Sequence, residues 1–116
     1  MKLFTGLHLA NRRLLVPATV VAEVGYLLNR EVGARVESLF LTALADGDFT
    51  PVDLTGEDYR RAAELVTTYA DLPLGTTDAT VVALAERLGV TEVATLDRRH
   101  FTVVRPRHAT ALTLLP

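Results

Sequence analysis

The sequence predicts an α/β domain in which a mostly parallel sheet lies between helices. Strand-like and helix-like segments alternate through most of the 116 residues, and this order is typical of parallel sheets with helices on both faces. Hydrophobic residues make up 49% of the chain, enough for one core at this length. We therefore expect residues 1–116 to form a single domain.

The N-terminal part is expected to pass from an irregular segment into a strand and a helix. Residues 1–13 show only weak helical spacing, interrupted by Gly6, and are predicted to be an irregular remnant or the frayed end of a helix. Residues 14–16 are a short apolar run typical of a buried strand, and Pro17 suits the turn that follows. Residues 19–30 then have the apolar periodicity of a helix.

The middle of the chain predicts helix, strand and helix. Residues 34–45 are helical, and residues 49–54 form a strand whose Pro51 favours a sheet edge. Thr55 and Asp58 then have the spacing of a capping box at the start of the next helix. The inward face of that helix is predicted to be Tyr59, Ala62, Ala63, Val66 and Tyr69.

Residues 74–101 predict a helix, a tight turn and a strand, and are the most regular part of the sequence. Val81, Leu84, Ala85 and Leu88 have the i, i+3, i+4, i+7 spacing of one buried helix face. Thr76 or Thr77 is expected to cap this helix, and Gly89 to end it in a left-handed conformation. Residues 90–96 are rich in β-branched side chains and predict a buried strand, and residues 111–115 predict a last strand.

Three carboxylates lie at strand ends or near helix starts in this arrangement. Glu23 falls on the apolar stripe of its helix, Asp78 lies in the first turn of another helix, and Asp97 directly follows a strand. In an open α/β sheet such positions converge on one edge. Oxygen-only ligands select hard cations, so the sequence predicts a site for Mg²⁺ or Mn²⁺ formed by Glu23, Asp78 and Asp97.

Glu23, Asp78 and the basic residues after Asp97 also have a purely structural interpretation. Glu23 fits a rim position or an ion pair with an arginine, and Asp78 complements the dipole at a helix N-terminus. Arg98, Arg99 and His100 follow Asp97 and suit contacts with RNA phosphates, or else a solvated rim.

Three stretches resemble PIN-domain proteins, in particular the VapC-type toxins of toxin–antitoxin pairs. They are PATVVAEVGYLL, LPLGTTDATVVALAERLG and VATLDRRHF, and the likeness runs from about Leu14 to the end of the chain. The resemblance implies a three-layer α/β/α domain that is a magnesium-dependent endoribonuclease, inhibited by a small antitoxin. It matches Glu23, Asp78 and Asp97 to acids of the family's site.

The sequence departs from that family pattern at its N-terminus. PIN domains open with a hydrophobic strand that ends in aspartate, whereas the thirteen residues before Leu14 contain no acid and leave little room for a parallel crossover. The sequence therefore predicts an N-terminally truncated domain, with weak or absent ribonuclease activity. A missing central strand would leave unpaired edges, so we also expect poor stability and a homodimer or other self-association.

Two alternatives differ in function. The first is a non-catalytic PIN-like module that binds an antitoxin or another chain. The second is a phospho-acceptor domain of the receiver type, which is disfavoured because the only lysine is Lys2. The formal net charge of −2 argues against a strongly basic nucleic-acid-wrapping protein. The absence of cysteine and of a membrane-length apolar run predicts a cytoplasmic protein without membrane attachment.

Overall fold

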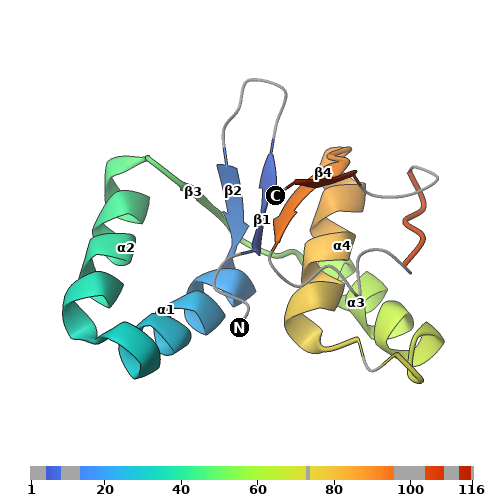
Figure 1. Cartoon of the computed structure of the whole chain (residues 1–116). Coiled ribbons are helices and arrows are strands. Elements are labelled where there is room, and N and C mark those ends of the chain that lie inside the picture. The colour runs from blue at the N-terminus through green and yellow to red at the C-terminus, as the bar shows by residue number, and fades with distance from the viewer. Residues whose placement is uncertain (1–4, 9–13, 73, 96–103, 109–112, 116) are drawn as a thin grey trace.

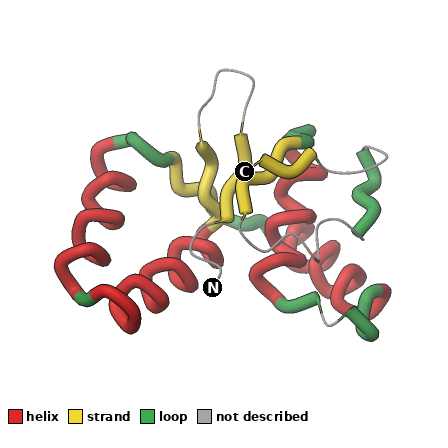
Figure 2. Tube along the Cα trace, viewed as in Figure 1, coloured by secondary structure: helices red, strands yellow, loops and turns green. Residues whose placement is uncertain are grey.

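Helices flank a five-stranded sheet in the computed structural model, which describes residues 5–8, 14–72, 74–95, 104–108 and 113–115 (Figure 1). Helices α1 and α2 lie on one side of the sheet, and α3 and α4 lie on the other (Figure 2). The strands are β1 (Thr5–His8), β2 (Leu14–Pro17), β3 (Thr50–Val52), β4 (Glu92–Thr95) and β5 (Thr113–Leu115). The helices are α1 (Ala18–Val32), α2 (Ala34–Asp46), α3 (Gly56–Thr68) and α4 (Thr76–Leu88).

The strand order is β3-β2-β1-β4-β5, with β1 at the centre. β2 pairs in parallel with β3, and β4 pairs in parallel with β5. β1 is antiparallel to both of its neighbours, so four of the five strands share one direction. The predicted α/β class with a mostly parallel sheet is confirmed.

The expected gap in the sheet is absent, because β1 fills it. Leu7 pairs with Leu15 on one side and with Val93 on the other. The prediction of an irregular or helical segment is therefore wrong for Thr5–His8. A parallel strand at this place would need a long crossover, whereas an antiparallel strand reaches β2 through the short connection of residues 9–13.

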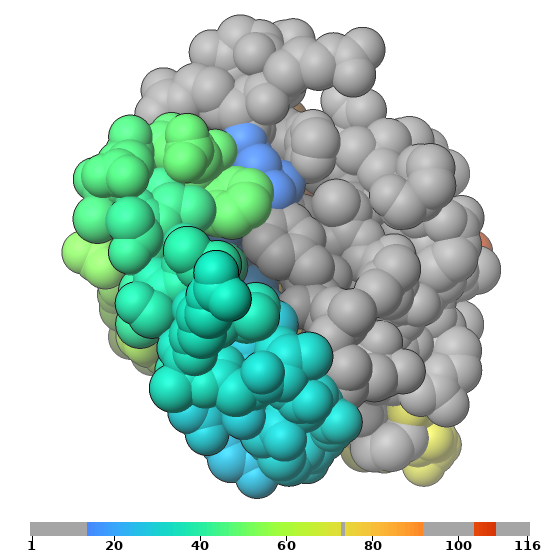
Figure 3. Space-filling view, turned by 60° about the vertical axis from the view of Figure 1, so that its left-hand side comes forward, coloured from blue at the N-terminus to red at the C-terminus, as the bar shows by residue number. Residues whose placement is uncertain are grey.

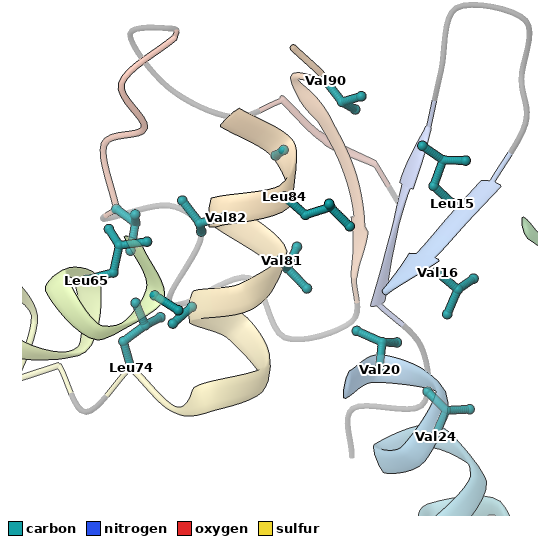
Figure 4. Close-up of a cluster of buried hydrophobic side chains, with 14 of the residues drawn as sticks. Leu15, Val16, Val20, Val24, Leu65, Leu74, Val81, Val82, Leu84 and Val90 are labelled. Carbon is teal, nitrogen blue, oxygen red and sulfur yellow. The ribbon is translucent and has the colours of Figure 1, made fainter. Parts of the chain in front are cut away.

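The hydrophobic core lies where α4 packs against the sheet, α1 and α3. All side chains from Asp78 to Ala85 are buried, so this helix is covered on every side. Figure 4 shows Val81 and Leu84 of α4 near Leu15 and Val16 of β2, with Val20 and Val24 of α1 below them. Because α1 contacts α4, the N-terminal turns of these two helices lie next to each other.

The predicted inward face of α3 differs from the structure. In α3 the buried residues are Asp58, Ala62 and Leu65, while Tyr59 and Val66 are exposed. The helix is rotated relative to the prediction because Leu65 enters the core and the buried Asp58 pairs with Arg87 of α4. The capping box between Thr55 and Asp58 is confirmed.

The described residues include no helix that is long and apolar enough to cross a membrane.

The face of α4 is mainly as predicted. Val81, Leu84 and Ala85 are buried, but Leu88 is 37% exposed because it lies in the last turn, beyond the sheet. Gly89 ends the helix at φ +67°, as predicted. The N-cap residue is Gly75, so neither Thr76 nor Thr77 has that role.

Candidate metal centre

Asp78 lies at the third position of α4, and its side chain is only 5% exposed. The helix begins after Gly75, whose extended backbone directs the chain into the first turn. Burying a carboxylate is costly unless hydrogen bonds, dipoles or cations stabilise its charge. The N–H groups and positive dipole end at this helix start supply part of that stabilisation.

Glu23 lies on α1 at the edge of the core. It is half-buried, between the buried Val20 and Val24 in the sequence. Helix α1 begins directly after β2, because Pro17 is both the last residue of the strand and the N-cap of the helix. Glu23 therefore lies in the second turn of α1, close to the carboxyl end of β2.

A hydrogen bond between Thr19 Oγ1 and Thr80 Oγ1, 2.7 Å long, joins α1 to α4. Glu23 lies one helical turn after Thr19, and Asp78 lies two residues before Thr80. The structure thus brings together the two segments that carry these acids. Asp97, Arg98, Arg99 and His100 lie outside the described residues, so the convergence of all three carboxylates stays a prediction.

The chemistry of these two side chains fits a hard cation. Both supply carboxylate oxygens, which suit Mg²⁺ or Mn²⁺ better than softer ions. Among the described residues, no three acids or histidines form a group that could hold a metal ion. A metal centre here therefore needs ligands beyond Glu23 and Asp78, such as water or Asp97.

A second set of charged residues, between α3 and α4, was missed by the sequence analysis. Asp58 accepts from Arg87 Nε at 3.0 Å, and Glu86 accepts from Arg61 at 2.8 and 3.0 Å. These pairs line a pocket of about 510 Å³ near the C-terminal end of α4. Only the capping box gave a signal in the sequence, because the other contacts join residues 25 or more positions apart.

Hydrogen bonding lowers the pKa of Asp58 and of Glu86. Burial alone would raise the pKa of Asp58, but hydrogen bonds from the Thr55 backbone and from Arg87 outweigh burial and lower it. For Glu86, burial is likewise outweighed by hydrogen bonds from Arg61 and from the Arg107 backbone. Both carboxylates are therefore ionised and paired at neutral pH, which indicates a structural role.

The same pocket anchors residues 104–108 against the helices. Arg107 donates its backbone N–H to Glu86 at 2.8 Å and its guanidinium to Glu64 at 2.9 Å. Arg105 donates its backbone N–H to the Tyr69 hydroxyl at 3.0 Å. The side chains of Glu57 and Glu64 pair with Arg60 and Arg107 at the exposed side of α3.

The fold and the acidic helix starts define a PIN domain. The family model described as "PIN domain" matches residues 4–105, which is most of the chain. The chain therefore belongs to the PIN-domain family.

A curated relative places the chain among the VapC-type members of that family. This relative is Ribonuclease VapC26 of Mycobacterium tuberculosis (strain ATCC 25618 / H37Rv), which is 38% identical over 103 residues. The alignment covers 89% of this chain and 76% of the relative.

A solved structure supports the fold independently. The crystal structure of Mycobacterium tuberculosis VapC20, titled a sarcin–ricin loop cleaving toxin, matches with a TM-score of 0.63 and 20% identity. The match covers 67% of this chain and 60% of the VapC20 chain. At this identity the match concerns the fold alone.

Proposed function

We propose that this chain is a magnesium-dependent endoribonuclease toxin of a type II toxin–antitoxin system, with Mn²⁺ as an alternative ion. The observation that carries the proposal is the buried Asp78 at the start of α4, joined to the helix that carries Glu23. The kinship with Ribonuclease VapC26 supports the same reaction class.

In this proposal Asp78, Glu23 and Asp97 hold the ion through their carboxylate oxygens. When bound, the ion would supply Lewis-acid stabilisation of the phosphodiester and a water of lowered pKa. Asp78 is 5% exposed, so we propose that its surroundings limit the positions that its oxygens can take. Arg98, Arg99 and His100 follow Asp97 in the sequence and are proposed to contact the RNA backbone.

The test is cleavage of a structured RNA with Mg²⁺ or Mn²⁺ by the wild type and by Asp78→Asn. Asparagine keeps the size of the side chain and removes its charge, so we expect cleavage to be lost. Glu57→Gln is the matched control, because the Glu57 side chain is 81% exposed on α3. Robust cleavage by Asp78→Asn, with the fold unchanged by circular dichroism, would contradict the proposed role.

A second candidate function is a non-catalytic PIN-like module that binds an antitoxin or another chain. The observation that favours it is the composition of β1, the central strand, which reads Thr-Gly-Leu-His and contains no acid. The first acidic residue of the sequence is Glu23. Absence of cleavage by a folded wild-type protein, together with antitoxin binding, would favour this function.

The proposed partners are RNA, a cognate antitoxin and a second copy of the chain, in the cytoplasm. Large apolar side chains on α1 and α2 are exposed, which is the kind of surface that protein partners cover. They are Tyr26, Val32, Val36, Leu39 and Leu41. Figure 3 shows this side of the molecule, with α2 in turquoise to green.

Light scattering on the purified chain tests self-association. We expect a dimer or larger species, and Leu39→Ser to shift it toward monomer, because the Leu39 side chain is 60% exposed on α2. A monodisperse wild-type monomer would contradict self-association but would leave the antitoxin proposal standing.

A further inference from the structure

We propose that Thr19 and Thr80 are a positioning pair that fixes α1 against α4 and so holds Glu23 and Asp78 in place for a divalent cation. The inference rests on the metal centre of the proposed function. It adds two residues that bind no metal themselves and act through the acids beside them.

The direction of the hydrogen bonds follows from the donors available. Thr80 Oγ1 donates to the backbone carbonyl of Thr77 at 2.7 Å. A hydroxyl has a single proton, so Thr80 Oγ1 must accept from Thr19 Oγ1 across their 2.7 Å contact. The result is a directed chain of hydrogen bonds from α1, through Thr80, to the first turn of α4.

Thr80 places its end of this contact in the core, while Thr19 at the other end is half-buried. Thr80 is 0% exposed, as are Val81 and Ala79 beside it and Val20 beside Thr19. A hydroxyl in such surroundings needs its hydrogen bonds, because burying an unpaired polar group is costly. Valine would fill the same space without that requirement, so packing alone does not explain a threonine at this position.

The pair lies within one helical turn of both acids. Thr19 and Glu23 are spaced i, i+4, which places them on the same face of α1. On α4, Asp78 is two residues from Thr80, and side chains two positions apart do not share a helix face. Thr80 therefore acts on Asp78 through the backbone of the first turn, where the Thr77 carbonyl accepts the Thr80 hydrogen bond. A shift of α1 against α4 would therefore change the separation of the two carboxylates directly.

Mg²⁺ is sensitive to such a shift. It demands near-ideal octahedral geometry with short bonds to oxygen, whereas Ca²⁺ accepts longer bonds and variable geometry. Groups that orient metal ligands typically change metal affinity about 10–100-fold when removed. Loss of the pair should therefore weaken the binding of Mg²⁺ more than the binding of Ca²⁺. A change in overall stability alone would not produce that selectivity.

The experiment measures Mn²⁺ binding by electron paramagnetic resonance, with Mg²⁺ and Ca²⁺ as competitors. The variants are Thr19→Val, Thr80→Val and the double variant. We expect each single variant to raise the Mn²⁺ dissociation constant roughly tenfold, and the double variant to raise it no further, since both changes remove one bond. Thr19→Ser keeps the hydroxyl and should restore binding to within about twofold of the wild type.

Thr42→Val is the matched control, because the Thr42 hydroxyl donates to Ser38 O at 2.9 Å on exposed α2. It should bind Mn²⁺ like the wild type. Thr19→Val leaves the Thr80 proton on Thr77 O, so it should stay folded; if it does not, Thr19→Ser and Thr80→Val decide the question.

Wild-type binding that is lost in Asp78→Asn but unchanged in folded Thr19→Val would overturn the positioning pair alone. Additive effects in the double variant would overturn it as well. Wild-type protein that binds no Mn²⁺, or binds it equally after Asp78→Asn, would overturn both the pair and the metal centre beneath it. Metal binding that depends on the pair, without RNA cleavage, would support the pair and contradict the proposed ribonuclease.

Discussion

Replacing Asp58 with alanine should destabilise the domain more than any other change of a charged residue on α3. The Asp58 side chain is 2% exposed and makes two kinds of hydrogen bond. Its Oδ2 accepts from Thr55 N at 2.9 Å to complete the capping box, and both oxygens accept from Arg87 Nε at 3.0 Å. Alanine removes both interactions.

The size of the effect follows from these two contributions. Loss of the bond from Thr55 N to Asp58 Oδ2 costs up to about 1 kcal/mol, the value of a whole helix cap, because Thr55 Oγ1 still accepts from the backbone N–H of residue 58. Loss of a hydrogen bond to a charged group costs about 1.5–3 kcal/mol. Arg87 limits the penalty, because it is 37% exposed and retains a 3.3 Å contact with Asp53 O. We expect a total loss of about 2–4 kcal/mol in the free energy of unfolding, or roughly 8–16 °C in Tm for a domain of this size.

Urea denaturation followed by circular dichroism measures this loss. Glu57→Ala is the matched control one position earlier, since its side chain is 81% exposed and meets Arg60 only at 3.4 Å. The control should stay within about 0.5 kcal/mol of the wild type. An Asp58→Ala variant that loses no more than the control would refute the conclusion that the buried pair and the cap stabilise α3.

Three further predictions concern the same helices. The lowered pKa values of Asp58 and Glu86 stabilise the fold at pH values above their unfolded pKa of about 4, and this stability is lost as pH falls through their folded pKa values. Urea melts from pH 7 to pH 3 should show this loss of stability. An Asp58→Asn/Glu86→Gln variant should lose less stability over the same pH range. Leu65→Ala should cost about 2–5 kcal/mol in a urea melt because Leu65 is 1% exposed, whereas Leu88→Ala, at a 37% exposed position, should cost clearly less; equal costs would contradict the observed packing. Gly89→Ala should lower Tm by several degrees, at about 1 kcal/mol, because φ is +67° there and a side chain is strained; an unchanged Tm would count against this strain.

From β2 onward the order of helices and strands was predictable, because each of these elements depends on local patterns. The α3 face shows where that reasoning stops. A carboxylate is seldom buried, so Asp58 was taken as a cap alone and the exposed Tyr59 as part of the core. The partner that makes burial of Asp58 possible, Arg87, lies 29 residues away on another helix. Such pairing is a property of the assembled fold and leaves no periodic signal.

The candidate site was predictable in part for a related reason. Glu23 and Asp78 were identified from their positions near helix starts, and the structure joins those helices. Their link through Thr19 and Thr80 was missed, since threonine is common at helix starts and the two residues are 61 positions apart. The central place of Thr5–His8 was also missed, because Gly6 interrupts the segment and its role shows only in its pairing with β2 and β4.

The antiparallel β1 has a consequence for the order in which the sheet is completed during synthesis. Its pairing with β2 joins neighbours in the sequence, so this hairpin can close early. Its other edge waits for β4, since Thr5 pairs with Thr95, ninety positions later. Until the ribosome has released β4, the middle of the future sheet is an open edge. A nascent chain in this state is exposed to strand exchange with other chains, and chaperone binding would protect it most during that interval.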